Sequence, residues 1–203
     1  MSNESPTTDP QVAQTVPVLN IANVLTVVRI ILVPIFIWLM LMEGVGARWW
    51  ALAVFCVAAF TDFLDGYLAR SMNLITDFGK IADPIADKAL VLSAFVLLSV
   101  AGALPWWVTA LIVLRELGIT LMRILMLSKI VIPASKGGKL KTVLQIGLII
   151  FLLIPWDTLG AGPTALTVIN VIAWLWIVAT LLVTLLSGGQ YVWNAWKASR
   201  SVQ

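Results

Sequence analysis

Six long apolar runs constrain this chain more than any other feature of its sequence. They cover residues 21–42, 49–67, 81–103, 106–127, 143–155 and 165–186. Most of them approach the roughly 20 residues that a membrane-spanning helix needs, and the fifth reaches that length by including residues 139–142. Only 11% of the 203 residues are charged, against roughly 25% in a soluble domain. The sequence therefore predicts an all-α integral membrane protein with six transmembrane helices.

One membrane domain accounts for these runs, because no internal repeat divides them into two halves. The first twenty residues are polar and contain no Lys or Arg, so they lack the positive leader of a secretory signal peptide. We expect a cytoplasmic tail over 1–19, the six-helix transmembrane domain over 20–187 and a second cytoplasmic tail over 188–203.

Positive charges are concentrated in alternate connecting segments. The segments expected on one side of the membrane hold eight of them: Arg70, Lys80, Lys129, Lys136, Lys139, Lys141, Lys197 and Arg200. The opposite loops contribute Arg48, together with several tryptophans. By the positive-inside rule, we expect a multi-pass protein of the cell (inner) membrane with both termini in the cytoplasm. Serving only as topology anchors is an alternative role for some of the lysines.

Four aspartates lie at the cytoplasmic ends of the second and third runs. Asp62 and Asp65 are three residues apart, and Asp83 and Asp87 are four apart, so each pair lies on one face of its helix. A carboxylate in hydrocarbon costs at least roughly 2.5–3.5 kcal/mol. Four of them close together raise one another's pKa, so protons or cations must neutralise them.

A hard divalent cation is the neutralising group that the composition favours. The chain has no histidine and one cysteine, Cys56, so the site has only oxygen ligands, which suit Mg²⁺, Mn²⁺ or Ca²⁺. Four carboxylates are enough to hold two such ions with positions open for substrate phosphates. Small residues on the same faces, Gly66, Ala69 and Gly79, leave room for a ligand or for close helix approach. Helix caps and ordinary ion pairs are the alternative role of the aspartates.

These residues together resemble the signature of the CDP-alcohol phosphotransferase family. The match covers eight fixed residues over 26 positions with every gap correct: Asp62, Asp65, Gly66, Ala69, Arg70, Gly79, Asp83 and Asp87. Four further stretches resemble the subgroup that uses glycerol 3-phosphate: NVLTVVR at 23–29, DFGKIADPIADK at 77–88, LRELGIT at 114–120 and GGKLKTVLQ at 137–145.

The resemblance implies a six-helix membrane enzyme, usually a homodimer, with a polar cavity open to the cytoplasm. Such an enzyme binds CDP-diacylglycerol and two divalent cations, Mg²⁺ or Mn²⁺. The hydroxyl of sn-glycerol 3-phosphate attacks the lipid-linked phosphorus, and CMP leaves. Membrane lipids are the expected surroundings, and no nucleic acid is expected as a partner.

The resemblance also implies roles for the signature residues. Asp62, Asp65 and Asp83 are expected to bind metal, and Asp87 to act as general base and also touch a metal. The CDP moiety is expected against four residues: Gly66, Ala69, Arg70 and Gly79. The composition agrees, because a primary hydroxyl needs a base and no histidine is present to supply one.

The phosphate of the acceptor needs cations of its own. Arg123, Lys139 and Lys141 are our candidates, with Arg115 either contributing directly or oriented by Glu116. A buried Arg115–Glu116 pair that only holds the fourth helix to its neighbours is the alternative. The sequence leaves open whether Arg29 reaches Glu116 or the acidic site.

Other functions fit parts of the sequence. Phosphatidylglycerol as acceptor would make the protein a CDP-diacylglycerol-dependent cardiolipin synthase, and an inositol phosphate would make it another phosphatidyltransferase. A divalent-cation transporter is the non-enzyme alternative. A transporter predicts acidic residues distributed through the bilayer depth, whereas all four aspartates lie near one membrane face.

Overall fold

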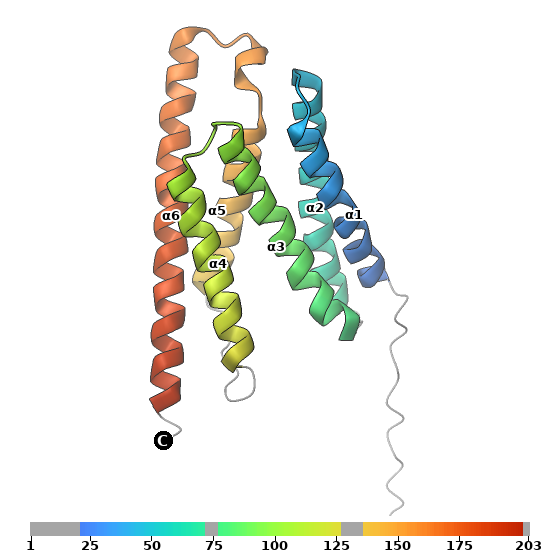
Figure 1. The fold of residues 1–203 in the computed structure, drawn as a ribbon, viewed down its shortest axis with the longest axis vertical. Coiled ribbons are helices and arrows are strands. Elements are labelled where there is room, and N and C mark those ends of the chain that lie inside the picture. The colour runs from blue at the N-terminus through green and yellow to red at the C-terminus, as the bar shows by residue number, and fades with distance from the viewer. Residues whose placement is uncertain (1–20, 72–76, 127–135, 201–203) are drawn as a thin grey trace, which may run out of the picture.

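The described residues form a bundle of six helices, seen here in a computed structural model (Figure 1). The structure describes residues 21–71, 77–126 and 136–200. The helices are α1 (Ile21–Leu41), α2 (Val45–Ser71), α3 (Asp77–Val100), α4 (Trp106–Met126), α5 (Lys136–Leu153) and α6 (Pro163–Arg200), with a short 3-10 helix η1 (Trp156–Leu159). Helix α6 continues beyond the predicted sixth run, whose last residue is 186.

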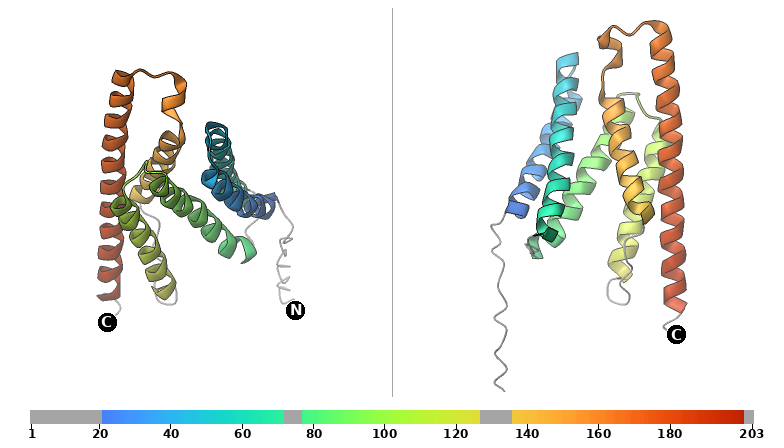
Figure 2. Two further views of the ribbon diagram at one scale, coloured as in Figure 1. Left: turned by 45° about the horizontal axis from the view of Figure 1, so that its top comes forward. Right: turned by 180° about the vertical axis from the view of Figure 1, so that it is seen from behind.

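The helices form two groups joined by α3. Helix α1 packs along α2 and α3, whereas α6 packs along α5 and α4. Helix α3 slants between the α1–α2 pair and α6, as the three views show together (Figures 1 and 2). The α1–α2 and α3–α4 turns and η1 lie at one end of the bundle, which we call the turn end. At the other end, the site end, α2, α4 and α6 finish and α3 and α5 begin.

The surface of the bundle is apolar where a membrane would contact it. Helix α6 exposes large apolar side chains, among them Leu175, Leu182 and Leu186. Polar Thr180, Thr184 and Ser187 are buried instead. A soluble protein usually exposes its polar side chains and buries its apolar ones, so the distribution on α6 is the reverse.

Within the described residues, three helices are long and apolar enough to cross a bilayer, judged by length and composition only: α1, α2 and α6. Helices α3, α4 and α5 each carry several charged residues, which lower their apolar character. The fold class that the sequence predicts, an all-α membrane protein, is confirmed. The domain limits at 19 and 187 stay predictions.

Close packing of aromatic and aliphatic side chains holds the helices together. Phe36 of α1 meets Phe55 of α2 with ring centroids 5.6 Å apart. Phe95 and Ile112 are fully buried and join α3 and α4 to the same core. Between α5 and α6 the approach is close enough that a Cβ added at Gly147 would lie 2.7 Å from Cζ2 of Trp176. These contacts position the charged residues described below.

We expect Gly147→Ala to destabilise the bundle, because the added methyl overlaps a half-buried indole ring. Overpacking of this kind costs roughly 1–3 kcal/mol, so the midpoint of thermal unfolding in detergent should fall. Gly118→Ala is the control, since a Cβ there meets nothing within 4 Å, and its midpoint should match the parent's. A Gly147→Ala midpoint equal to the parent's would contradict this description of the α5–α6 contact.

Candidate functional site

Arg29 of α1 holds the first aspartate pair. Its NH1 lies 2.7 Å from Oδ1 of Asp62, and its NH2 contacts Oδ2 of Asp65. The Arg29 side chain is 0% exposed and that of Asp65 5%, whereas Asp62 is 33% exposed. A guanidinium presents its nitrogens as a planar fork that matches carboxylate oxygens. The two carboxylates are therefore bound by one buried cation, while Asp62 remains partly exposed to solvent.

A second charged cluster surrounds Glu116 of α4. Its Oε1 accepts hydrogen bonds from Lys141 Nζ at 2.6 Å and from Arg115 NH1 at 3.0 Å, and its Oε2 lies 3.5 Å from Lys88 Nζ. The three cations come from α3, α4 and α5. We call Lys88, Arg115 and Lys141 with Glu116 the basic cluster, because it has three cations for one carboxylate.

The basic cluster is attached to α6 through Arg115. Its Nε donates to the carbonyl oxygen of Thr184 at 3.1 Å, and its NH2 donates to Ser187 Oγ at 2.9 Å. Gln145 of α5 donates to the hydroxyl of Thr184 at 3.3 Å. Three helices are thus connected by polar contacts inside an otherwise apolar bundle.

Asp87 of α3 is near enough to both charged groups to interact with them. The charged side chains that act on it electrostatically are Arg29 of the first group and Lys88, Lys141 and Glu116 of the basic cluster. The acidic half of the site, Asp62 and Asp65, has two carboxylates for one guanidinium, and the basic cluster has the opposite imbalance. Such a division suits a cation at one half and an anion at the other.

The donor set of the acidic half fits a hard divalent cation. All its described ligand atoms are carboxylate oxygens, and they outnumber the positive charge of Arg29. Among the described side chains no three acidic, His or Cys groups gather closely enough to bind one metal ion. The side chain of Asp83, the fourth predicted ligand, is outside that part of the chain.

Several other predicted site residues have side chains outside the described part of the chain: Gly66, Ala69, Arg70, Gly79 and Arg123. Their roles stay predictions. Lys139 is described and exposed, and it forms no ion pair with the described carboxylates. Of the predicted phosphate-binding cations, the structure brings together Arg115 and Lys141.

Five residues that the sequence analysis left without a role belong to this network. Arg29, whose partner was open, contacts the aspartates and not Glu116. Lys88 joins the basic cluster, while Gln145, Thr184 and Ser187 lie behind it. Polar residues three and four apart in an apolar run were the available signal for Thr180, Thr184 and Ser187.

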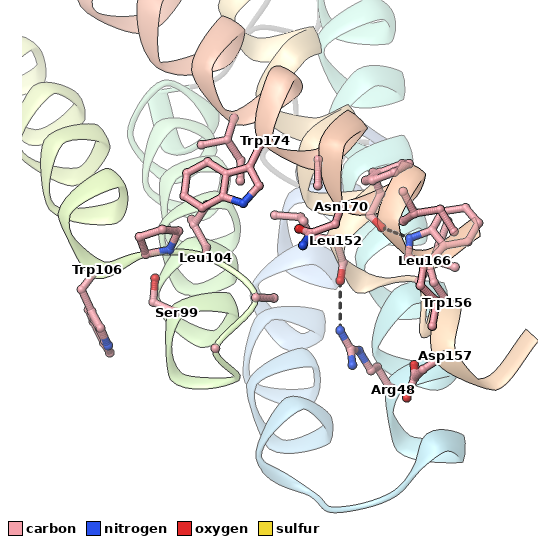
Figure 3. A pocket seen from close by; sticks show the side chains of 18 residues that line it. Arg48, Ser99, Leu104, Trp106, Leu152, Trp156, Asp157, Leu166, Asn170 and Trp174 are labelled. Carbon is pink, nitrogen blue, oxygen red and sulfur yellow. Dashed lines mark hydrogen bonds between the residues drawn. The ribbon is translucent and has the colours of Figure 1, made fainter. Parts of the chain in front are cut away.

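A cavity of the described chain lies elsewhere, at the turn end (Figure 3). It measures about 680 Å³, and its lining includes Trp106, Trp156 and Trp174. Arg48 points into it and donates a hydrogen bond to the carbonyl of Leu152 at 3.1 Å. The lining contains none of the charged residues of the two clusters, so this cavity is not the candidate site.

Comparison with known proteins identifies relatives that match most of the chain. Residues 19–186 match the model of a family described as CDP-alcohol phosphatidyltransferase. A Mycobacterium tuberculosis protein named probable phosphatidylglycerophosphate synthase is 43% identical over 189 residues, 91% of this chain and 86% of that protein. Proteins named CDP-diacylglycerol–glycerol-3-phosphate 3-phosphatidyltransferase are 38% identical in Rickettsia typhi (85% of this chain, 94% of the relative) and 33% identical in Bacillus subtilis (90% and 98%).

Removing Arg29 should destabilise the bundle strongly. Arg29→Met leaves the buried Asp65 without its guanidinium partner, and breaking a buried pair costs roughly 3–5 kcal/mol. Thermal unfolding in detergent should show a lower midpoint, which Arg29→Met combined with Asp65→Asn should partly restore. Lys139→Met is the stability control because Lys139 is exposed. Unfolding of Arg29→Met at the parent temperature would contradict the role of this contact.

Proposed function

The chain belongs to the CDP-alcohol phosphatidyltransferase family, and we propose that it transfers the phosphatidyl group of CDP-diacylglycerol to sn-glycerol 3-phosphate. The products are phosphatidylglycerophosphate and CMP. The names of the relatives support this choice of substrates. One observation carries the proposal, namely that the bundle contains an acidic half at Asp62 and Asp65 and a separate basic cluster around Glu116, and that Asp87 interacts electrostatically with residues of both.

The acidic half is proposed to receive the diphosphate of CDP-diacylglycerol. Enzymes of this family depend on metal, and Asp62, Asp65, Asp83 and Asp87 would hold two divalent cations, Mg²⁺ or Mn²⁺. When bound, such ions neutralise the carboxylates and offset the charge on the departing phosphate. Arg29 keeps Asp62 and Asp65 in place from the buried side. The cytidine is assigned to the residues of the signature: Gly66, Ala69, Arg70 and Gly79.

The basic cluster is proposed to receive the phosphate of the acceptor. Its three cations exceed the single charge of Glu116, so a phosphate dianion is attracted there. Within the cluster, Lys141 offers a charged donor, the ammonium group that contacts Glu116 at 2.6 Å. Lys139, exposed two residues away, and Arg123 are assigned to the approach of the soluble acceptor.

Asp87 is proposed to accept the proton of the attacking hydroxyl. A bond forms between the acceptor oxygen and the phosphorus of the phosphatidyl group, and the bond from that phosphorus to the CMP oxygen breaks. The hydroxyl proton passes to the Asp87 carboxylate, which must lie within hydrogen-bond reach of the acceptor. Its electrostatic interaction with Arg29 of the acidic half and with Lys88 and Lys141 of the basic cluster supports this role, because the two substrates would meet near such a residue.

The membrane orientation remains part of the proposal. The chain is a membrane protein, and the concentration of cations at the site end favours a cytoplasmic site and cytoplasmic termini in the cell membrane. A cytoplasmic site also suits a soluble phosphorylated acceptor. The homodimer that the resemblance implies stays a prediction.

The function is tested by CMP release from CDP-diacylglycerol by the purified protein in detergent. We expect release with glycerol 3-phosphate and Mg²⁺ or Mn²⁺, and loss of release with a chelator. Phosphatidylglycerol and inositol phosphate are the matched alternative acceptors. Faster release with either of them than with glycerol 3-phosphate would overturn the proposed acceptor.

Lys141→Met should weaken use of the acceptor selectively. Removing a hydrogen bond to a charged group costs about 1.5–3 kcal/mol, so we expect KM for glycerol 3-phosphate to rise roughly tenfold or more. KM for CDP-diacylglycerol should change little, because the diphosphate is assigned to the other half. Lys197→Met, an exposed change in the last turns of α6, is the control. Equal rises in both KM values would contradict the assignment of Lys141.

A further inference from the structure

We propose that a short segment of α6, residues 184–188, positions Arg115 and thereby fixes the geometry of the acceptor-phosphate site. We call this segment the α6 seat. Ser187 and Gly188 are its positioning residues. The inference deepens the proposed function and rests on it. Neither residue lies in a motif that the sequence analysis singled out.

All three nitrogens of the Arg115 guanidinium are engaged by protein acceptors. Nε and NH2 bond to α6, at the Thr184 carbonyl and the Ser187 hydroxyl, and NH1 bonds to Glu116. A planar guanidinium held at all three nitrogens has one orientation. Arg115 therefore works as a rigid link that transmits the position of α6 to Glu116.

Gly188 makes the close approach of Arg115 possible. A Cβ added there would lie 3.1 Å from Nε and 3.2 Å from Cγ of Arg115. It is the residue four after Thr184, so the missing side chain also leaves the Thr184 carbonyl accessible to the guanidinium. The next glycine, Gly189, has nothing within 4 Å of its added Cβ. The two adjacent glycines thus differ in how closely an added side chain would approach Arg115.

Ser187 supplies a donor and an acceptor at once. Its hydroxyl donates to the Thr184 carbonyl at 3.0 Å, which orients an oxygen lone pair toward Arg115 NH2. Both Ser187 and Thr184 are buried. A buried hydroxyl bonded in this way holds the guanidinium at a fixed place in an apolar surrounding.

The effect on function follows from the contact that Arg115 makes with Glu116. Its NH1 and the ammonium of Lys141 share one oxygen of Glu116, so a displaced guanidinium disturbs the cations that would receive the phosphate. The acidic half is built on α1 and α2, whereas the α6 seat is bonded to Arg115 of α4. A substitution in the α6 seat should thus weaken binding of the acceptor and leave binding of CDP-diacylglycerol unchanged.

The experiment compares KM values of four single variants of the full chain in detergent. Ser187→Ala and Gly188→Ala should raise KM for glycerol 3-phosphate roughly tenfold, the scale of one lost hydrogen bond to a charged group. KM for CDP-diacylglycerol should stay within twofold of the parent's, about the scale of an ordinary surface change. Ser187→Thr keeps the hydroxyl and should restore most of the acceptor affinity. Gly189→Ala is the matched control and should behave as the parent does.

A double-variant comparison keeps the inference testable if Gly188→Ala fails to fold. In an Arg115→Met background, Ser187→Ala should add no further rise in KM, because both changes remove the same contact. Independent effects, or equal changes in both KM values, would overturn the inference. If the parent protein itself did not transfer the phosphatidyl group to glycerol 3-phosphate, the proposed function would be rejected instead. The two failures are therefore distinguishable.

Discussion

Pairing of buried charges is the constraint on which this structure depends. Arg29 is completely buried between α1 and α2, and it is stable there because it contacts the carboxylates of Asp62 and Asp65. Glu116 is likewise surrounded by cations from three helices. These contacts hold the functional side chains in an interior whose exterior must remain apolar for the membrane. The packing of Phe36 against Phe55, and of Gly147 against Trp176, brings the helices close enough for the charged groups to meet.

The pairing is incomplete on both sides, and that imbalance connects the fold to the chemistry. The acidic half retains excess negative charge, while the basic cluster retains excess positive charge. Helix α3 slants between the two helix groups (Figure 2). It contributes two adjacent residues, Lys88 of the basic cluster and Asp87, which interacts electrostatically with both halves. In the proposed function, a metal-bound diphosphate at one half and an anionic acceptor at the other would meet near α3, with their charges kept at separate places.

Much of this could be predicted from the sequence, because apolar run length and helical spacing are local properties. The run beginning at Trp106 starts where α4 starts, and the aspartate spacing correctly placed Asp62 beside Asp65. Partners between helices were harder, since spacing along one helix does not say which neighbour it faces. Arg29 had two possible partners for that reason. Ser187 and Gly188 were missed because their role depends on the path of the Arg115 side chain from another helix.

The proposed role of Asp87 as general base is most directly tested by measuring CMP release by the Asp87→Asn variant. The substrates are CDP-diacylglycerol and glycerol 3-phosphate, at saturating divalent metal. We expect the variant to bind CDP-diacylglycerol as the parent does but to release CMP roughly 10²- to 10⁴-fold more slowly, the usual contribution of a general base. Release at a rate close to the parent's would contradict the role of Asp87 as the base.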